Sequence, residues 1–189
     1  MPNALIACLL SLPLLLAAVT GGSVQEPLAA ARAAGTHLLM RHATAPGTGD
    51  PAGFTLGDCS TQRNLSEAGR AQSRRIGERL RQAGVAIDTV LSSQWCRSSE
   101  TAQLLGLGPV EAAPELNSFF ANRGDGAAQT NALKARLARL DAAGRKAALV
   151  SHQVNITALT DIYPASGEIV VIALGADGAI TVEGRLRTD

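Results

Sequence analysis

The chain has 189 residues, enough for one domain with a sizeable core and too few for a large second one. Lys and Arg number 17 against 16 Asp and Glu, so the net charge of +1 excludes the global basic field that recruits nucleic acid. Aromatic residues make up only 3% of the chain, and base-stacking platforms are therefore not expected. Any recognition of an anion must be local.

The first residues differ in character from the rest of the chain. Residues 4–19 form an almost unbroken apolar run that small residues follow, a pattern typical of a cleaved secretory signal. A membrane anchor is the alternative, but a spanning helix needs roughly 20 apolar residues, and Pro13 interrupts this run. We therefore expect an export segment and short linker over residues 1–34 and a single domain over residues 35–189. The mature protein would be periplasmic or secreted, without stable membrane anchoring.

The remaining chain alternates between apolar runs and helical patterns. Strands are predicted at 36–40, 85–91, 147–150, 168–174 and 179–182, the last two as a hairpin. Helices are predicted at 67–83, 97–105, 131–143 and 156–162, with Ser66, Ser92 and Ser93 as candidate N-caps. This alternation predicts an α/β fold, a mainly parallel sheet with an antiparallel edge and helices on both faces.

Polar residues follow three of the predicted strands. Arg41 and His42 come directly after the first strand, Arg97 lies beyond the second, and His152 follows the strand at 147–150. In open α/β sheets the ligand site lies beyond the carboxyl ends of the strands. We therefore expect these residues to converge although they are far apart in sequence.

Four segments, in this order along the chain, resemble the motifs of one family. They are LMRHA (39–43), NLSEAG (64–69), SSQWCRSSETA (92–102) and VSH (150–152). Each is weak by itself, but together they resemble the histidine phosphatase (phosphoglycerate mutase-like) superfamily, here as an exported bacterial-type member. The resemblance covers about residues 36–174. It implies a three-layer α/β/α fold and phosphoryl-transfer chemistry.

By this resemblance, His42 is the nucleophile. A neutral imidazole attacks phosphorus, forms a phosphohistidine and then passes the phosphoryl group to water. Arg41 and Arg97 would hold the phosphoryl oxygens, because a guanidinium fork matches phosphate and stays charged. His152 would bind the same oxygens and donate to them as charge develops.

Other polar residues near these motifs have less certain roles. Arg63 could grip a phosphate or carboxylate of the substrate, or be an ordinary surface cation. His37, inside the first strand, is expected to be buried structure. The arginines supply the charge neutralisation that Mg²⁺ supplies in other enzymes, so neither a metal nor a cofactor is expected.

The sequence departs from the family at the general acid. Many members carry a carboxylate in an L-x-E segment, and here Ser118 stands at that position. Glu115 or Asp125 could protonate the leaving oxygen if its loop folds over the site, but both could equally be surface residues. If no acid is used, substrates with good leaving groups would be favoured.

Two cysteines, Cys59 and Cys96, remain after removal of the export segment that contains Cys8. An oxidising compartment favours pairing of an even number of cysteines, and both flank the inferred pocket. A disulfide is therefore predicted, with two separate buried thiols as the alternative.

These features predict a phosphatase that hydrolyses a phosphate monoester, or a related phosphoryl compound, outside the cytoplasm. Its partner would be a small phosphorylated substrate rather than nucleic acid, and no oligomeric state is predicted. A phosphomutase of the same superfamily is one alternative. A non-catalytic phosphate-binding module that kept the arginines and lost the acid is the other.

Overall fold

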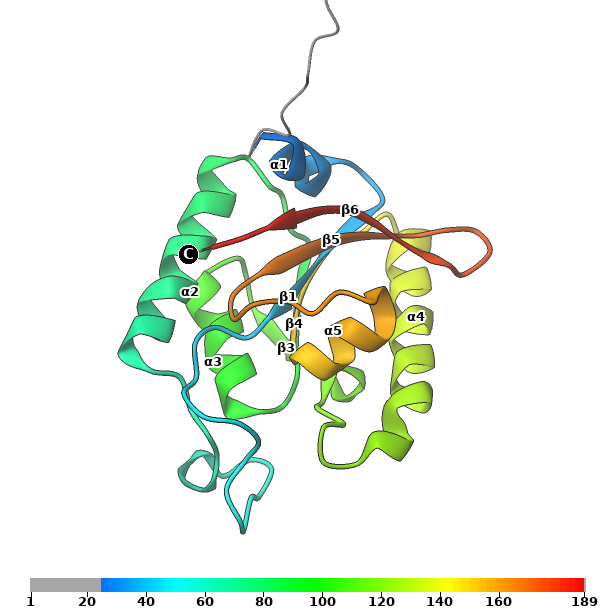
Figure 1. Cartoon of the computed structure of the whole chain (residues 1–189). Coiled ribbons are helices and arrows are strands. Elements are labelled where there is room, and N and C mark those ends of the chain that lie inside the picture. The colour runs from blue at the N-terminus through cyan, green and yellow to red at the C-terminus, as the bar shows by residue number, and fades with distance from the viewer. Residues whose placement is uncertain (1–24, 189) are drawn as a thin grey trace, which may run out of the picture.

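The structure is a computed structural model that describes residues 25–188. In this part of the chain, six strands form one sheet in the order β3-β2-β4-β1-β5-β6 (Figure 1). The strands are β1 (Thr36–Arg41), β2 (Thr89–Ser92), β3 (Val110–Ala112), β4 (Ala147–Ser151), β5 (Ile169–Leu174) and β6 (Ile180–Leu186). β1 to β4 are parallel, whereas β5 and β6 pair antiparallel. The predicted mainly parallel sheet with an antiparallel edge is confirmed.

Helices cover both faces of this sheet (Figure 1). One face carries α1 (Gln25–Arg32), α2 (Glu67–Gln82) and α3 (Cys96–Leu105), and the other carries α4 (Gly126–Ala142) and α5 (Gln153–Thr160). Successive side chains of a strand point to opposite faces. Leu38 accordingly packs in the first layer and Leu39 in the second. The three-layer α/β/α architecture is therefore also confirmed.

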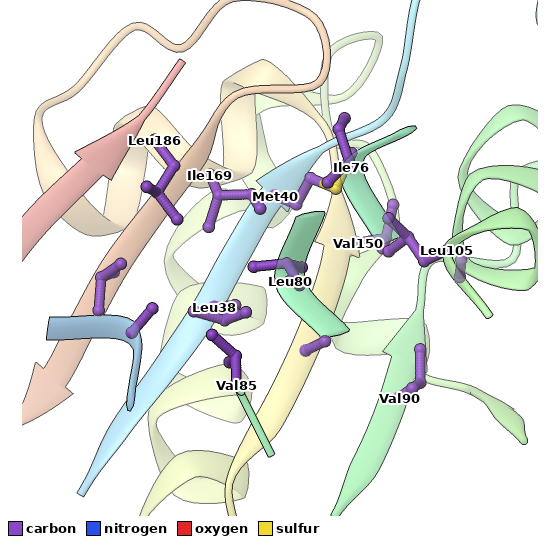
Figure 2. Packing of buried hydrophobic residues seen from close by; sticks show 14 residues of the cluster. Leu38, Met40, Ile76, Leu80, Val85, Val90, Leu105, Val150, Ile169 and Leu186 are labelled. Atoms are coloured by element: carbon purple, nitrogen blue, oxygen red, sulfur yellow. The ribbon is translucent and has the colours of Figure 1, made fainter. Parts of the chain in front are cut away.

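The layer beneath α2 and α3 is built from aliphatic side chains. Figure 2 shows Leu38 and Met40 of β1 facing Ile76 and Leu80 of α2, with Val150 of β4 beside them. All five are nearly or completely buried. Full burial of one such side chain stabilises a fold by about 1.5–3 kcal/mol. This packing fixes the strand whose last residues enter the functional site.

Helix α1 lies upstream of the domain boundary expected at residue 35. Ala31 is fully buried in the core, and Lys146 donates from Nζ to the carbonyl oxygens of Ala31 and Ala33 at 2.6 Å each. A cation at the carboxyl end of a helix also complements the helix dipole. Helix α1 thus packs on the folded domain, although it falls within residues 1–34, for which an export segment and short linker were expected. The predicted signal itself lies outside the described residues.

The remaining differences from the predicted elements are at their ends. β2 begins later than predicted, because Val85 closes the turn after α2 with a backbone hydrogen bond to Leu80 (3.0 Å). α4 and α5 both begin earlier than predicted, and the short edge strand β3, with its mostly exposed side chains, was not predicted. The hairpin around Asp177 is confirmed.

The carboxyl ends of β1, β2 and β4 meet at one end of the sheet, from which the loops at 42–66 and 113–125 project (Figure 1). The first loop ends at Ser66, where α2 begins. Ser66 Oγ accepts from the backbone N–H of Gly69 (3.0 Å), so Ser66 is the N-cap of α2, as predicted. Over residues 25–188, no helix combines the length and apolarity needed to cross a membrane.

Candidate active site

A pocket of about 450 Å³ lies at the carboxyl end of the sheet. It brings together residues from β1, its following loop, α3 and the end of β4: Arg41, His42, Arg63, Arg97 and His152. A hollow of similar size, about 410 Å³, lies at the opposite end of the sheet beside Arg32 and Lys146, but no histidine lines it. The histidines and arginines of the family motifs therefore meet in the first pocket.

His42 is 2% exposed, and its Nδ1 lies 2.8 Å from the carbonyl oxygen of Ala43. A carbonyl oxygen only accepts hydrogen bonds, so Nδ1 carries the proton and Nε2 keeps a lone pair. Burial lowers the pKa of His42 to about 3, and the positive charges of Arg97, Arg41 and Arg63 add to the shift against the opposing bond to Ala43. The side chain is therefore neutral, with an unprotonated Nε2, at neutral pH.

Nε2 of His42 faces Arg97, whose Nε donates to it at 3.3 Å. The two amino groups of Arg97 donate to one carboxylate, from Nη1 to Asp50 Oδ1 (2.6 Å) and from Nη2 to Asp50 Oδ2 (3.1 Å). This is the bidentate geometry in which a guanidinium also binds phosphate. The Asp50 carboxylate thus occupies the bidentate face of the Arg97 guanidinium.

Asp50 is held in this position by a second donor. Trp95 donates from Nε1 to Asp50 Oδ2 at 3.0 Å. Burial by itself would raise the pKa of Asp50, but the hydrogen bonds from Arg97 and Trp95 outweigh it and lower the pKa. The carboxylate is therefore ionised while it remains on Arg97.

His152 lies opposite His42, with their ring centroids 5.4 Å apart. Its Nε2 is 2.8 Å from Ser93 Oγ and 3.4 Å from Ser98 Oγ. Burial, together with His42 and the neighbouring arginines, lowers the pKa of His152 well below its ordinary value, so this ring is also neutral. Ser92 and Ser93 were predicted as N-caps of the helix that carries Arg97, and that was wrong. Trp95 occupies the cap position, and Ser93 instead satisfies a buried ring nitrogen.

The two remaining arginines differ in what they hold. Arg63 donates from Nε to Gly49 O (2.8 Å) and from Nη1 to Ala45 O. These two hydrogen bonds fix the backbone of the loop that carries Asp50. Arg41 donates from Nη1 to a backbone carbonyl (2.9 Å), while its buried Nε has no hydrogen-bond partner among the described residues. An unpaired buried donor is costly, and a bound anion would satisfy it.

Cys59 and Cys96 form a disulfide, which confirms the prediction. It joins residues 37 apart in sequence, and closing such a loop stabilises a fold by about 4 kcal/mol in the chain-entropy model. Cys96 immediately precedes Arg97, and Cys59 belongs to the loop that contains Arg63. The bridge therefore ties the start of α3 to this loop.

Glu115 and Asp125 are not brought to the pocket. Oε1 of Glu115 points toward Arg136 of α4, 3.9 Å from its Nε, and Asp125 is exposed and accepts from Asn122 Nδ2 (2.8 Å). Neither carboxylate therefore meets the condition set for a role as the general acid, that its loop folds over the site. The one carboxylate that lines the pocket within residues 25–188 is Asp50, which sequence reasoning missed. The available signal was two acids, Asp50 and Asp58, in a loop rich in Gly and Pro.

His37 has the structural role expected of it. Its Nδ1 accepts from the backbone N–H of Ala147 (3.1 Å), and its Nε2 lies 3.0 Å from Asp141 Oδ1. Both ring nitrogens are therefore occupied. Within the described part of the chain, no group of three or more His, Cys, Asp or Glu residues is placed to hold a metal ion.

Several solved structures that are similar to this one are phosphatases by name. The protein histidine phosphatase SixA complexed with tungstate superposes with a TM-score of 0.61 and 21% identity, over 81% of this chain and 97% of that one. SixA from Nakamurella multipartitia gives 0.56 and 21%, over 82% and 98% of the two chains. Mycobacterial glucosyl-3-phosphoglycerate phosphatase gives 0.54 and 17%, over 79% and 97%. At these identities the likeness shows the fold.

Curated protein sequences give no match to this chain. The family description "Histidine phosphatase superfamily (branch 1)", however, matches residues 37–151, more than half of the sequence. The matched region contains both arginines and the first histidine of the motifs, and His152 follows it directly. The chain therefore belongs to the histidine phosphatase superfamily.

Proposed function

We propose that the protein is a phosphatase that hydrolyses a phosphate monoester, or a related phosphoryl compound, through a phosphohistidine on His42. The observation that carries this proposal is the neutral, buried His42, whose unprotonated Nε2 faces the guanidinium of Arg97. Family membership supports phosphatase or phosphomutase chemistry. Hydrolysis is favoured because similar structures are named for phosphatases, including a phosphoserine phosphatase from Entamoeba histolytica.

In the first step, Nε2 of His42 forms a bond to phosphorus as the bond from phosphorus to the leaving oxygen breaks on the opposite side. Arg97 and Arg41 hold the phosphoryl oxygens, and His152 donates to them while charge develops. The leaving oxygen receives the electron pair of the broken bond and needs a proton to depart as an alcohol.

We assign the donation of this proton to Asp50, the carboxylate that lines the pocket. A phosphoryl group that binds Arg97 removes hydrogen bonds from Asp50 and adds negative charge beside it, and both changes raise the pKa of this carboxyl. Asp50 then takes up a proton and gives it to the leaving oxygen. This residue replaces Glu115 and Asp125 as the candidate general acid.

In the second step, water attacks phosphorus and the bond from phosphorus to Nε2 breaks. The electron pair returns to Nε2, and the proton that water loses goes to Asp50. Phosphate leaves, and His42 is again neutral. All described steps use side chains of this chain alone.

We further propose that the enzyme works in the periplasm or as a secreted protein, on a small exported phosphate compound. Two observations support this location. Residues 4–19 form an apolar run of the kind found in cleaved signals. The Cys59–Cys96 disulfide is the second, because disulfides form and persist in oxidising compartments. N-terminal sequencing of protein from a periplasmic or culture fraction tests it, and recovery of an intact Met1 from the cytosol would contradict it.

Turnover and trapping with 4-nitrophenyl phosphate test the enzymatic proposal. The full chain should release nitrophenolate and phosphate in equal amounts and, when quenched, should carry an acid-labile phosphate. His42→Ala should show neither. Arg136→Lys, a change in an ion pair with Glu111 outside the pocket, is the matched control and should behave as the parent.

Three outcomes would contradict hydrolysis through His42. Sustained turnover by His42→Ala would exclude the nucleophile. Binding of phosphate without release of nitrophenolate would indicate the non-catalytic module, because an aryl phosphate needs little help from an acid. Return of the phosphoryl group to a second position of a substrate, without free phosphate, would indicate a mutase.

A further inference from the structure

The aromatic residues of this chain are few and gather in one place. The sequence contains three Phe, one Trp and one Tyr. Four of these five line the active-site pocket: Phe54, Trp95, Phe120 and Tyr163. The fifth, Phe119, is buried next to Phe120. The two core layers are aliphatic, so aromatic side chains are concentrated where a substrate would bind rather than where the fold is packed.

Two of the four aromatic rings form a fixed wall beside the reacting groups. Phe54 stacks on Trp95, with centroids 5.0 Å apart and ring planes 20° apart. Trp95 in turn packs edge-on against His152 (5.5 Å) and is anchored through Nε1 to Asp50 (3.0 Å). This wall connects the phosphoryl site to the rest of the pocket.

The other two rings lie on two separate loops. Phe120 precedes α4 and is 46% exposed, and Tyr163 follows α5 and is 71% exposed. Large side chains that line a pocket and yet remain exposed gain little for the fold. They gain contact area when a ligand covers them.

The size and charge of the pocket restrict the rest of the substrate. A volume of about 450 Å³ is within the range that encloses a drug-sized molecule, far more than a phosphoryl group needs. Arg41, Arg63 and Arg97 face a single carboxylate, Asp50, so the pocket carries excess positive charge. A positively charged leaving group would be repelled.

We infer that the substrate is a phosphate ester of an alcohol that carries a ring and no positive charge, and that the ring lies against the aromatic side chains of the pocket. The inference rests on the proposed function in taking the phosphoryl group to bind at Arg97 and His42. An aromatic ring and the apolar face of a sugar ring offer the same stacking chemistry. The substrate series below distinguishes these two sources.

Two pairs of esters with matched leaving oxygens test the ring requirement. 2-Phenylethyl phosphate should have a kcat/KM about 10-fold higher than ethyl phosphate, mainly through a lower KM, because two aromatic contacts together contribute on this order. Glucose 6-phosphate against glycerol 3-phosphate is the sugar arm. A preference in either pair supports the inference and identifies the kind of ring. Equal kcat/KM values within both pairs would overturn it.

Variants at the exposed rings test where the preference arises. Phe120→Ala and Tyr163→Ala should each raise the KM for the preferred ring ester several-fold, with a much smaller change for its ringless partner. Val182→Ala on β6 removes an apolar side chain of similar exposure, 41%, away from the pocket, and is the matched control. Equal effects of the two ring variants on both esters of a pair would overturn the assignment.

A binding measurement separates this inference from the proposed catalysis. 2-Phenylethylphosphonate and ethylphosphonate contain no ester bond to hydrolyse, and calorimetry gives their affinities directly. Tighter binding of the ring compound that is lost in Phe120→Ala and Tyr163→Ala would support the inference even if no ester is turned over. Equal affinities of the two phosphonates would overturn an aromatic ring as the occupant even if esters are hydrolysed.

Discussion

His37 and His42 lie at opposite ends of the same short strand and differ in one chemical respect. Both are buried, and burial lowers the pKa of both, so both rings are neutral. Asp141 and the backbone N–H of Ala147 occupy the two ring nitrogens of His37. In His42 the opposite nitrogen carries the proton: Nδ1 donates to the carbonyl oxygen of Ala43, and Nε2 accepts from Nε of Arg97, a side chain that lines the pocket, at 3.3 Å. Burial makes a histidine neutral, but its hydrogen-bond partners decide whether it can act as a nucleophile.

Replacement of each histidine by alanine tests whether His42 acts in catalysis and His37 in stability. We expect His42→Ala to lose about 1,000-fold or more in kcat while its thermal midpoint stays near that of the parent. His37→Ala should do the reverse, because it leaves the buried backbone N–H of Ala147 without a partner, a cost of about 1–3 kcal/mol. Steady-state kinetics and thermal unfolding of both variants measure the two effects. A stable but inactive His37→Ala protein would contradict the division of roles.

Arg97→Lys changes the group that Nε2 of His42 faces. A lysine keeps the positive charge but cannot bind two phosphoryl oxygens with one planar fork. We expect kcat/KM to fall by about 100-fold or more, the scale of losing one donor to the transition state. Kinetics with 4-nitrophenyl phosphate measure this loss. Turnover near that of the parent would mean that Arg97 is not a phosphate ligand.

Asp50→Asn removes the proton donor and leaves the shape of the side chain. Alkyl phosphates should lose about 100-fold or more in kcat, whereas 4-nitrophenyl phosphate, whose leaving group needs no proton, should lose much less. Asp58→Asn, a change in the same loop at a carboxylate that accepts from the backbone N–H and Oγ of Ser60, is the matched control. If Asp50 only positions Arg97, both esters will lose the same factor.

Because the buried histidines are neutral, the free energy of unfolding should fall when the pH is lowered. Their pKa values are ordinary, about 6.5, in the unfolded chain and lower in the folded one, with that of His42 at about 3. Below about pH 6.5 the unfolded state therefore binds protons that the native state does not, and each such proton costs about 1.4 kcal/mol per pH unit. Denaturant unfolding should give a lower free energy of unfolding at pH 5 than at pH 7. A higher value at pH 5 would contradict neutral histidines.

Much of the architecture and the centre of the site could be predicted, because local patterns encode them. Four-to-six-residue apolar runs mark β1 and β4, and family motifs mark Arg41, His42, Arg97 and His152. Helix α1 was missed because its Ala-rich sequence continues the composition of the export segment. Its place on the sheet depends on Lys146, more than 100 residues away.

Asp50 and the aromatic pocket could not be predicted, because both depend on how loops fold back over the sheet. Gly47 has a φ of +91°, and a Cβ there would lie 3.3 Å from Cδ of Arg63, so the turn that delivers Asp50 needs a glycine packed against that arginine. The hydrophobic periodicity of the sequence does not predict contacts of this kind. The same holds for Phe120 and Tyr163, which come from separate loops and meet only in the folded protein.

The identity of the phosphorylated nitrogen tests the central claim most directly. Protein labelled with ¹⁵N-histidine can be quenched during turnover of an aryl phosphate and unfolded at alkaline pH, where phosphohistidine survives. The coupling between ³¹P and ¹⁵N then identifies the bonded atom. Because Nδ1 of His42 donates to Ala43 and Nε2 carries the lone pair, we expect phosphorus on Nε2 of His42. Phosphorus on Nδ1, or on a residue other than His42, would contradict it.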